Sequence, residues 1–448
     1  MTEEKKQTVL VIGAGPAGLY SAGKLAESGK NVVLLNRDIK YGGLAEYGIY
    51  VSKHKMKEGI RKQFRKILAN PSIEYFGNVT VGKKSSVSLE DIKGLGFDAI
   101  MVTVGAQGTK KVGITGEDAK GVFHAKDLVY HYNHLPPFSE KEVEIGKRVA
   151  VIGVGNVMVD IAHWLVHTKK VEQAIAIARR GPNERAYTDK EFQAIAYNAD
   201  VESIKTELDR IKPFLEKVDQ DADATFQALT KDCAKPYYEE KSPTKFSFKF
   251  LSAPKALITN EKNEVIGLEV DDNELVSKDG KIAAKSLGKT SVIDLDAVIF
   301  AIGDTVDSSF GLPVNKWGEF IKNETVYEED PTANLYELVA PESNKVTEGV
   351  FVAGWSRKAS DGLVGIAKKD GETCVKYVLK YLEGKNVANE NVLSDFSKLI
   401  ADKNVNFINK NDIEKLEAVE KQEAEKRNLE FYKFDSNNEM LEVLNKLK

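Results

Sequence analysis

Cysteine is nearly absent from this sequence, and so are the patterns that use it. Only Cys233 and Cys374 occur among 448 residues, which excludes an iron–sulfur cluster held by four thiolates of this chain. Their wide separation also excludes a CxxC redox pair. We expect both to be buried free thiols in a reducing compartment, although a disulfide between them stays open. Redox chemistry would therefore need a bound organic cofactor, and we predict no metal site.

Long apolar runs and an excess of charge are absent as well. No run approaches the roughly 20 apolar residues that a membrane-spanning helix needs. The first residues, Met1–Lys6, lead straight into a predicted strand, so we expect no signal peptide. A net charge of -4 with 29% charged residues gives no reason to expect nucleic acid or an anionic membrane as a partner. The length suggests about two or three domains, and we expect a cytoplasmic protein.

What the sequence does have is a short apolar run, Thr8–Ile12, that breaks into spaced glycines. The run and the helical spacing of apolar residues after it predict a strand that turns sharply into a helix. Gly13 would allow the turn, Gly15 would let a pyrophosphate approach the backbone, and Gly18 would let helix and strand pack closely. A second strand is predicted at 31–35. This context favours a dinucleotide-binding unit over a glycine-rich turn in another kind of α/β protein.

Further features are expected at the same edge of this sheet. Residues 97–106 predict a buried parallel strand that ends in Gly105. Ligands of such sheets bind at the carboxyl ends of the strands, so Gly105 should lie near Gly13. The second strand ends at Asn36, where an acid that binds a ribose hydroxyl is usual, and a glycine-rich loop follows at 41–48.

The opening pattern returns at 148–160, with Gly153 at the turn and Met158 in the third glycine position. The strand after it ends in Arg179 and Arg180 rather than an acid. Two guanidiniums at this position suit a ribose 2′-phosphate, which takes paired charge-assisted hydrogen bonds. The sequence therefore favours NADP over NAD. The alternative is that both arginines are surface residues at a strand end.

An acid-free segment, 241–255, carries four lysines, among them Lys241, Lys245 and Lys249. These lysines could dock an acidic protein and speed its encounter. They could equally protect the edge of a strand from aggregation, since phenylalanines at every second position in 246–250 predict a half-buried strand here.

Other segments predict the rest of the elements. Alternating charges in 200–223 are typical of exposed helices, and buried strands are expected within 294–304 and 349–355. An amphipathic helix should then run to Leu382. From 389 onward the chain is charged and helical in pattern, which predicts a packed C-terminal appendage with a solvated face.

Together these motifs resemble glutathione-reductase-like flavoproteins with two dinucleotide-binding domains, and among them the adrenodoxin reductase and ferredoxin–NADP reductase family. The resemblance runs nearly end to end. Its supports are Phe76–Gly82, Ile114–Glu117, Gly153–Val157 with Asp160, Ala178–Pro182 and, as the most specific, Gly354-Trp355 followed by Gly362.

The resemblance implies an α/β fold with two Rossmann-like domains and C-terminal helices. The FAD domain would be discontinuous, at 1–106 and 332–448, and the NADP domain would span 107–331. The implied FAD-binding residues are Gly13, Gly15, Ala17, Gly18, Asn36, Gly43, Leu44, Val79, Gly105, Gly354, Trp355, Gly362, Leu363 and Val364. The implied NADP(H)-binding residues are Gly155, Asn156, Val157, Arg179, Arg180 and Glu191.

Catalytic roles are also implied for Asp160, His54 and Trp355. Asp160 matches a family carboxylate proposed to take part in a proton route, with a helix-surface acid as the alternative. His54 is displaced by one position from the family histidine. Asn36 lacks the usual acid's charge, and Met158 stands where the family has a small residue.

Three functions stay open. The first is a free-standing enzyme that moves a hydride from NADPH to FAD and single electrons to a ferredoxin-type iron–sulfur protein, or the reverse. The second is the flavin subunit of a larger complex, because loop 42–49 is similar to the small subunit of glutamate synthase. The third is a flavoprotein binding module whose catalytic residues have changed.

Overall fold

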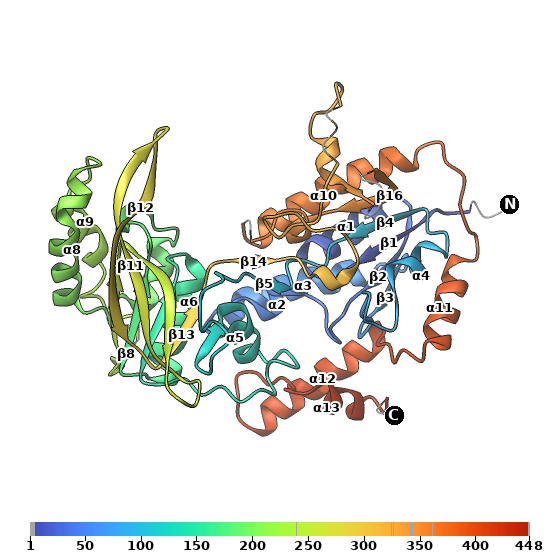
Figure 1. Cartoon of the computed structure of the whole chain (residues 1–448). Coiled ribbons are helices and arrows are strands. Elements are labelled where there is room, and N and C mark those ends of the chain that lie inside the picture. The colour runs from blue at the N-terminus through green and yellow to red at the C-terminus, as the bar shows by residue number, and fades with distance from the viewer. Residues whose placement is uncertain are drawn as a thin grey trace. The chain divides into compact units, whose positions relative to one another are not determined.

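The structure is a computed structural model that describes residues 5–238, 240–323, 325, 327–340, 345–360 and 362–446. The chain divides into two compact units (Figure 1). Met1–Lys110, Tyr130–Glu140 and Gly303–Lys448 form the first unit, and Lys111–Val129 with Lys141–Ile302 form the second. A discontinuous first unit built around a parallel sheet agrees with the predicted fold class.

A six-stranded sheet forms the centre of the first unit, in the order β15-β16-β4-β1-β2-β3. All neighbours are parallel except β15, which runs antiparallel to β16. Apolar runs form these strands because both faces of the sheet are covered. The strands are β1 (Thr8–Ile12), β2 (Asn31–Leu35), β3 (Ile73–Phe76), β4 (Ala99–Val102), β15 (Glu337–Val339) and β16 (Val346–Val352).

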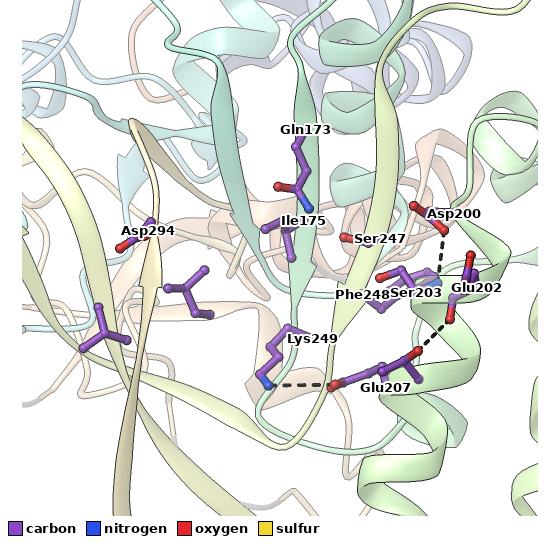
Figure 2. A pocket seen from close by; sticks show the side chains of 13 residues that line it. Gln173, Ile175, Asp200, Glu202, Ser203, Glu207, Ser247, Phe248, Lys249 and Asp294 are labelled. Carbon is purple, nitrogen blue, oxygen red and sulfur yellow. Dashed lines mark hydrogen bonds and ion pairs between the residues drawn. The ribbon is translucent and has the colours of Figure 1, made fainter.

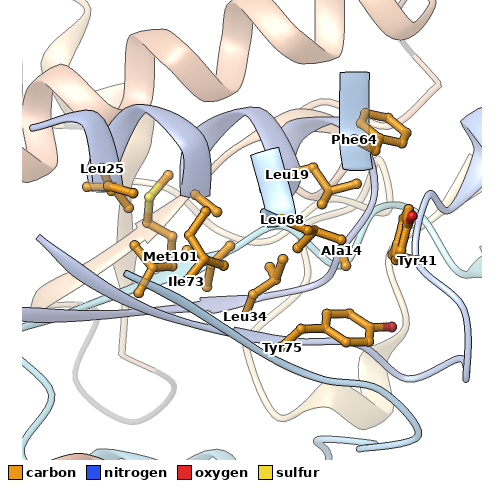
Figure 3. Close-up of a cluster of buried hydrophobic side chains, with 14 of the residues drawn as sticks. Ala14, Leu19, Leu25, Leu34, Tyr41, Phe64, Leu68, Ile73, Tyr75 and Met101 are labelled. Atoms are coloured by element: carbon orange, nitrogen blue, oxygen red, sulfur yellow. The ribbon is translucent and has the colours of Figure 1, made fainter. Parts of the chain in front are cut away.

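Helices cover both faces of this sheet, and each face has its own apolar cluster. Figure 3 shows part of one cluster, to which Leu19, Phe64 and Met101 belong. The helices of this unit are α1 (Pro16–Glu27), α2 (Leu44–Tyr47), α3 (His54–Leu68), α4 (Leu89–Lys93), α10 (Val364–Leu382), α11 (Val392–Asp402), α12 (Lys410–Lys426) and α13 (Asn437–Val443).

The C-terminal helices contribute side chains to the core, which goes beyond the predicted packed appendage. Phe396 and Ile400 of α11 are buried in the cluster on one face of the sheet, and Ile413 and Leu416 of α12 are buried in the cluster on the other. Their outward faces are charged, as predicted. These helices therefore complete the core of the first unit.

The chain returns to the first unit at Gly303, before the boundary predicted at 331/332. Val306, Phe310 and Phe320 explain the difference, because all three are buried in the apolar cluster that contains Leu10 of β1. The short strands β5 (Gly108–Thr109) and β14 (Asp304–Thr305) pair with each other at this return.

The second unit contains a five-stranded parallel sheet in the order β6-β13-β7-β8-β9 and an antiparallel sheet in the order β10-β11-β12. The strands are β6 (Val122–His124), β7 (Arg148–Ile152), β8 (Gln173–Ile177), β9 (Lys245–Lys249), β10 (Ser252–Thr259), β11 (Val265–Lys278), β12 (Lys281–Asp294) and β13 (Ala297–Phe300). The helices are α6 (Asn156–Trp164), α7 (Asp189–Ala196), α8 (Val201–Glu216) and α9 (Ala222–Thr230), while α5 (Ala125–Tyr132) begins in this unit and ends in the first.

Two predictions for the second unit underestimated how much of an element is buried. The helix α8 is amphipathic rather than exposed, since Ile204, Leu208 and Ile211 are buried. The strand β9 is not half-buried, because Ser247 is buried like the phenylalanines on either side of it. Packing of α8 against β9 accounts for both differences.

Two predictions about the whole chain can also be compared with the structure. Cys233 and Cys374 are both buried free thiols, as expected. Among the helices that the structure describes, none combines the length and the apolar character needed to cross a membrane.

Candidate cofactor-binding sites

The first glycine turn lies between β1 and α1. Gly13 has φ +110°, and a Cβ there would lie 2.5 Å from the carbonyl oxygen of Thr103. A Cβ at Gly18 would lie 1.9 Å from the carbonyl oxygen of Gly13. At Gly15, by contrast, a Cβ would meet no atom within 4 Å. The fold itself requires Gly13 and Gly18, whereas the open space at Gly15, over the N-terminus of α1, fits a pyrophosphate.

Other implied residues lie at the same edge of the sheet. Gly43 approaches the turn so closely that a Cβ there would lie 3.0 Å from the Cα of Gly15. A Cβ at Gly354, which follows β16, would lie 2.7 Å from the Cβ of Ala17. Gly105 follows β4, the strand between β16 and β1. The carboxyl ends of neighbouring strands thus bring together residues that are far apart in the sequence.

Asn36 is buried, and its side chain is used by the protein itself. The Oδ1 atom accepts a hydrogen bond from the N–H of Ala14 at 3.2 Å. The Nδ2 atom donates to the carbonyl oxygens of Asp38 and Lys40, each at 2.9 Å. Asn36 therefore ties the glycine turn to the loop after β2. A ribose contact through Asn36 stays a prediction, and only its oxygen has capacity left for one.

Val79 and Leu44 have packing roles in the first unit. Val79 is buried, and its N–H donates to the carbonyl oxygen of Asn36 at 2.9 Å. Leu44 begins α2 and packs against a small cluster that contains Tyr47 and Tyr130. Their predicted contact with FAD is not contradicted by these roles.

The start of α10 is the most exposed part of the candidate FAD site. Gly362 has φ +74°, Leu363 is 73% exposed, and Val364 is the first residue of the helix.

The three predicted catalytic residues lie in different elements. Trp355 lies in a short 3-10 turn, Gly354–Ser356, in the first unit. His54 begins α3, and its Nε2 atom lies 2.9 Å from Oε1 of Glu430, a partner that the sequence did not indicate. Asp160 lies on α6 in the second unit. A proton route through Asp160 and His54 stays a prediction.

The second glycine turn lies between β7 and α6. Gly153 has φ +121°, and a Cβ there would lie 2.5 Å from the carbonyl oxygen of Ala301. A Cβ at Gly155, before the first residue of α6, would meet no atom within 4 Å. Met158 is fully buried, so the bulky side chain in the third glycine position is accommodated in the core. The two turns thus have the same division between constrained and open glycines.

Arg179 and Arg180 follow β8, as predicted. Arg179 is exposed and Arg180 is partly exposed. The protein uses their backbone carbonyl oxygens, which accept hydrogen bonds from the side chain of Asn273 and the N–H of Leu251. Across the residues that the structure describes, neither guanidinium pairs with a carboxylate. Two cations that pair with no carboxylate in the described part of the chain are available here to a phosphate.

Thr188 is a residue near the second turn to which the sequence assigned no role. The N–H of Thr188 donates a hydrogen bond to Oδ1 of Asn156 at 2.9 Å. The hydroxyl of Thr188 caps α7 by accepting from the N–H of Glu191. The Thr-x-x-Glu spacing at the start of α7 could have indicated this cap. Val157, exposed by 45%, lies on the same first turn of α6.

The predicted lysine surface carries less free charge than the sequence indicated. Lys245 lies 3.7 Å from Asp200, and Lys249 lies 3.8 Å from Glu207. Lys241 is exposed, with its Nζ atom 4.7 Å from the ring centroid of Tyr197.

Beside these lysines lies a groove of about 620 Å³ between α8, the parallel sheet and β12 (Figure 2). Its ionisable residues are mostly acids, namely Asp200, Glu202, Glu207 and Asp294, with Lys249 as the cation. This groove therefore does not favour an acidic partner.

The chain is similar in sequence to known proteins. Residues 7–235 match the model of the family described as pyridine nucleotide-disulphide oxidoreductase. The chain is 26% identical over 415 residues to NADPH-ferredoxin reductase FprA of Mycobacterium leprae, covering 84% of each chain. It is 24% identical to mitochondrial NADPH:adrenodoxin oxidoreductase of Arabidopsis thaliana, covering 94% of this chain and 92% of that one.

A solved structure has the same fold. It is FprA of Mycobacterium tuberculosis in complex with NADPH, with a TM-score of 0.78, 23% identity, and coverage of 98% of this chain and 99% of that one. The family model, which covers the first glycine turn and the second, agrees with the paired strand–turn–helix units of the structure. The chain belongs to the pyridine nucleotide-disulphide oxidoreductase family, and it is an oxidoreductase.

Proposed function

We propose that this protein transfers a hydride from NADPH to bound FAD and then passes single electrons to a ferredoxin-type iron–sulfur protein, or runs in the reverse direction. The relatives named above as NADPH-ferredoxin and NADPH:adrenodoxin reductases support the reaction. FAD supplies the conversion between a two-electron hydride and single electrons. The observation that supports the nucleotide preference is the pair of guanidiniums of Arg179 and Arg180 after β8, for which the described residues provide no carboxylate partner.

The residues of the first unit fit FAD. The open space at Gly15 and the free N–H groups at the start of α1 would hold the pyrophosphate. Gly43, Gly105 and Gly354 lie at the same edge of the sheet, and Gly43 and Gly354 allow the segments that carry them to approach the glycine turn and α1 closely. The buried thiols support a reaction without a cysteine pair, because burial raises the pKa of Cys233 to about 11 and that of Cys374 well above its usual value.

The residues of the second unit fit NADPH. Gly155 would let the pyrophosphate approach the N-terminus of α6, and the cap at Thr188 fixes the segment that holds Glu191. Arg179 and Arg180 would bind the 2′-phosphate, which NADH lacks. We further propose that Trp355 shields the reacting ring and that Asp160 and His54 take part in proton movement.

An anaerobic titration tests the nucleotide sites. We expect NADPH to bleach the flavin absorption band at a much lower concentration than NADH. Changing both arginines, Arg179→Gln with Arg180→Gln, should weaken NADPH at least about tenfold, since a charge-assisted hydrogen bond is worth about 1.5–3 kcal/mol. The affinity for NADH should stay unchanged.

The matched control is Lys147→Gln, which removes an exposed cation before β7, at the opposite end of the sheet. It should leave both affinities unchanged. Equal responses of the wild type to NADPH and NADH would refute the role of the arginine pair. A flavin that neither nucleotide reduces would refute the reaction and favour the binding-module hypothesis.

The partner is tested by coupling NADPH oxidation to a ferredoxin and then to cytochrome c. We expect turnover that falls with ionic strength, because charged surfaces speed such encounters. The docking surface stays a proposal, for which Lys241→Glu is the most direct probe. No turnover with any ferredoxin, together with a larger native mass in the source cells, would support the complex-subunit hypothesis. A cytoplasmic location is part of this proposal, and cell fractionation checks it.

A further inference from the structure

A partly buried carboxylate, Asp370, holds the turn that carries Trp355. Asp370 lies on α10 with its side chain 12% exposed. One oxygen accepts a hydrogen bond from the N–H of Gly354 at 2.6 Å. The other accepts from the hydroxyl of Tyr336 at 3.1 Å. The guanidinium of Arg357 adds hydrogen bonds from Nε, at 3.1 and 3.2 Å, and from Nη2.

Arg357 is the counterion of this carboxylate. Its side chain is 17% exposed, and its Cζ atom lies 4.5 Å from the ring centroid of Tyr336. Burial alone would lower the pKa of this guanidinium, but the hydrogen bonds and the charge of Asp370 outweigh burial and raise it. Both oxygens of Asp370 thus accept hydrogen bonds from this turn and from Tyr336 and Arg357.

The other side of Trp355 is fixed as well. Ser356 is fully buried, and its Oγ atom accepts a hydrogen bond from the N–H of Gly105 at 2.7 Å. Gly354 has φ +69° and lies against Ala17. The backbone before Trp355 is thus held by a charged pair on α10 and its turn, and the backbone after it is held by the end of β4.

A largely desolvated ion pair is a costly way to hold a turn, because two charges must lose much of their contact with water. An apolar contact would stabilise the fold at least as well. The carboxylate offers something that an apolar side chain cannot, which is a directed acceptor for the Gly354 N–H at the predicted flavin-binding edge. The position of Trp355, rather than stability alone, is what this arrangement defines.

We propose that Asp370 is a positioning residue for the flavin, which it serves by fixing the Gly354–Trp355 turn, with Arg357 as its counterion. The inference rests on the proposed function, since it requires bound FAD. Asp370 does not touch the reacting atoms. By holding the backbone of this turn, it would fix the position of Trp355 at the predicted flavin-binding edge.

The test compares Asp370→Asn with Glu383→Gln. The two variants make the same chemical change, but Glu383 is exposed at the end of α10. Asparagine would turn either its oxygen or its NH₂ group toward Arg357, so it cannot serve both donors as the carboxylate does. We expect the visible circular dichroism of bound flavin to change in Asp370→Asn. The limiting rate of flavin reduction should fall about tenfold, equal to about 1.4 kcal/mol, with the NADPH dissociation constant unchanged.

Glu383→Gln should match the wild type in both readouts. If Asp370→Asn does not fold, Arg357→Lys provides the same test, because it keeps the charge and loses the paired geometry. A folded variant of either kind with wild-type flavin dichroism and a wild-type reduction rate would overturn the inference while the proposed function stands. A wild-type protein that binds no flavin would overturn both.

Discussion

Lys57 is a buried lysine whose pKa should make the stability of the first unit depend on pH. It is 4% exposed on α3, and its Nζ atom donates to Oδ1 of Asn133 at 2.5 Å. Its pKa is lowered from 10.5 to about 7, mainly by burial and also by the charges of Lys433 and Arg61, while Glu46 opposes the shift. The folded protein therefore releases a proton that the unfolded chain keeps.

The sign of the effect follows from this difference. Between about pH 7 and 10.5 the unfolded chain binds more protons, so the free energy of unfolding rises with pH in this window. The slope from Lys57 approaches about 1.4 kcal/mol per pH unit, and the whole shift corresponds to about 5 kcal/mol. Below pH 7 both states carry the charge, and this contribution to the slope vanishes.

The variant Lys57→Met removes the titrating group. The assay is urea unfolding of the first unit, repeated in pH steps of about 0.5 from about pH 7.5 to about pH 9.5. We expect the free energy of unfolding of the wild type to rise with pH relative to that of the variant. The difference in slope should be about 1.4 kcal/mol per pH unit. Lys55→Met is the control, since Lys55 is exposed on the same helix. Parallel pH profiles for the wild type and Lys57→Met would refute the reasoning, whatever their absolute stabilities.

Three further predictions follow from other buried groups. Glu46→Gln should destabilise the first unit by about 3–5 kcal/mol, because it leaves the buried cations around it without their counterion; a loss below about 1 kcal/mol in thermal unfolding would contradict this. Gly15→Ala should lose FAD but keep the stability of the apoprotein, whereas Gly18→Ala should lower that stability, and calorimetry of both apoproteins distinguishes them. Cys233 and Cys374 should resist an aromatic disulfide reagent until the protein unfolds, so rapid labelling of the native state would count against their burial.

Local patterns predicted the parts of the fold that neighbouring residues determine. The strand–turn–helix at Gly13 and its repeat at Gly153 depend on a short apolar run, a sterically required glycine and helical spacing. All three lie within a few residues, so the sequence displays them directly. The division of the chain into two such units followed from finding the pattern twice.

Contacts between distant segments were not predictable in the same way. The ribose contact of Asn36 stays a prediction, but the sequence did not indicate the two carbonyl oxygens of the loop after β2 that hold its amide. The lysines of β9 were expected to be free, but α8 supplies acids to Lys245 and Lys249. In each case the partner is set by tertiary packing, and neither spacing nor composition encodes it.

The buried ion pairs show the same limit most clearly. Glu46 pairs with Lys433 at 2.5 Å, and Asp370 pairs with Arg357. A sequence pattern treats such residues as solvated by default, because most charged side chains are exposed. Only the fold reveals that these charges are buried and that their removal should be costly.

Some glycines of the two turns are required by the fold, and others leave space that a ligand could use. At Gly13, Gly18 and Gly153 an added Cβ would collide with backbone oxygens, so the protein's own atoms explain these residues. At Gly15 and Gly155 the same test finds no atom within 4 Å. Both lie before the first turn of a helix, where backbone N–H groups favour an anion. The same open position in both units is explained if each helix N-terminus binds the phosphates of a dinucleotide, one for each nucleotide that the reaction requires.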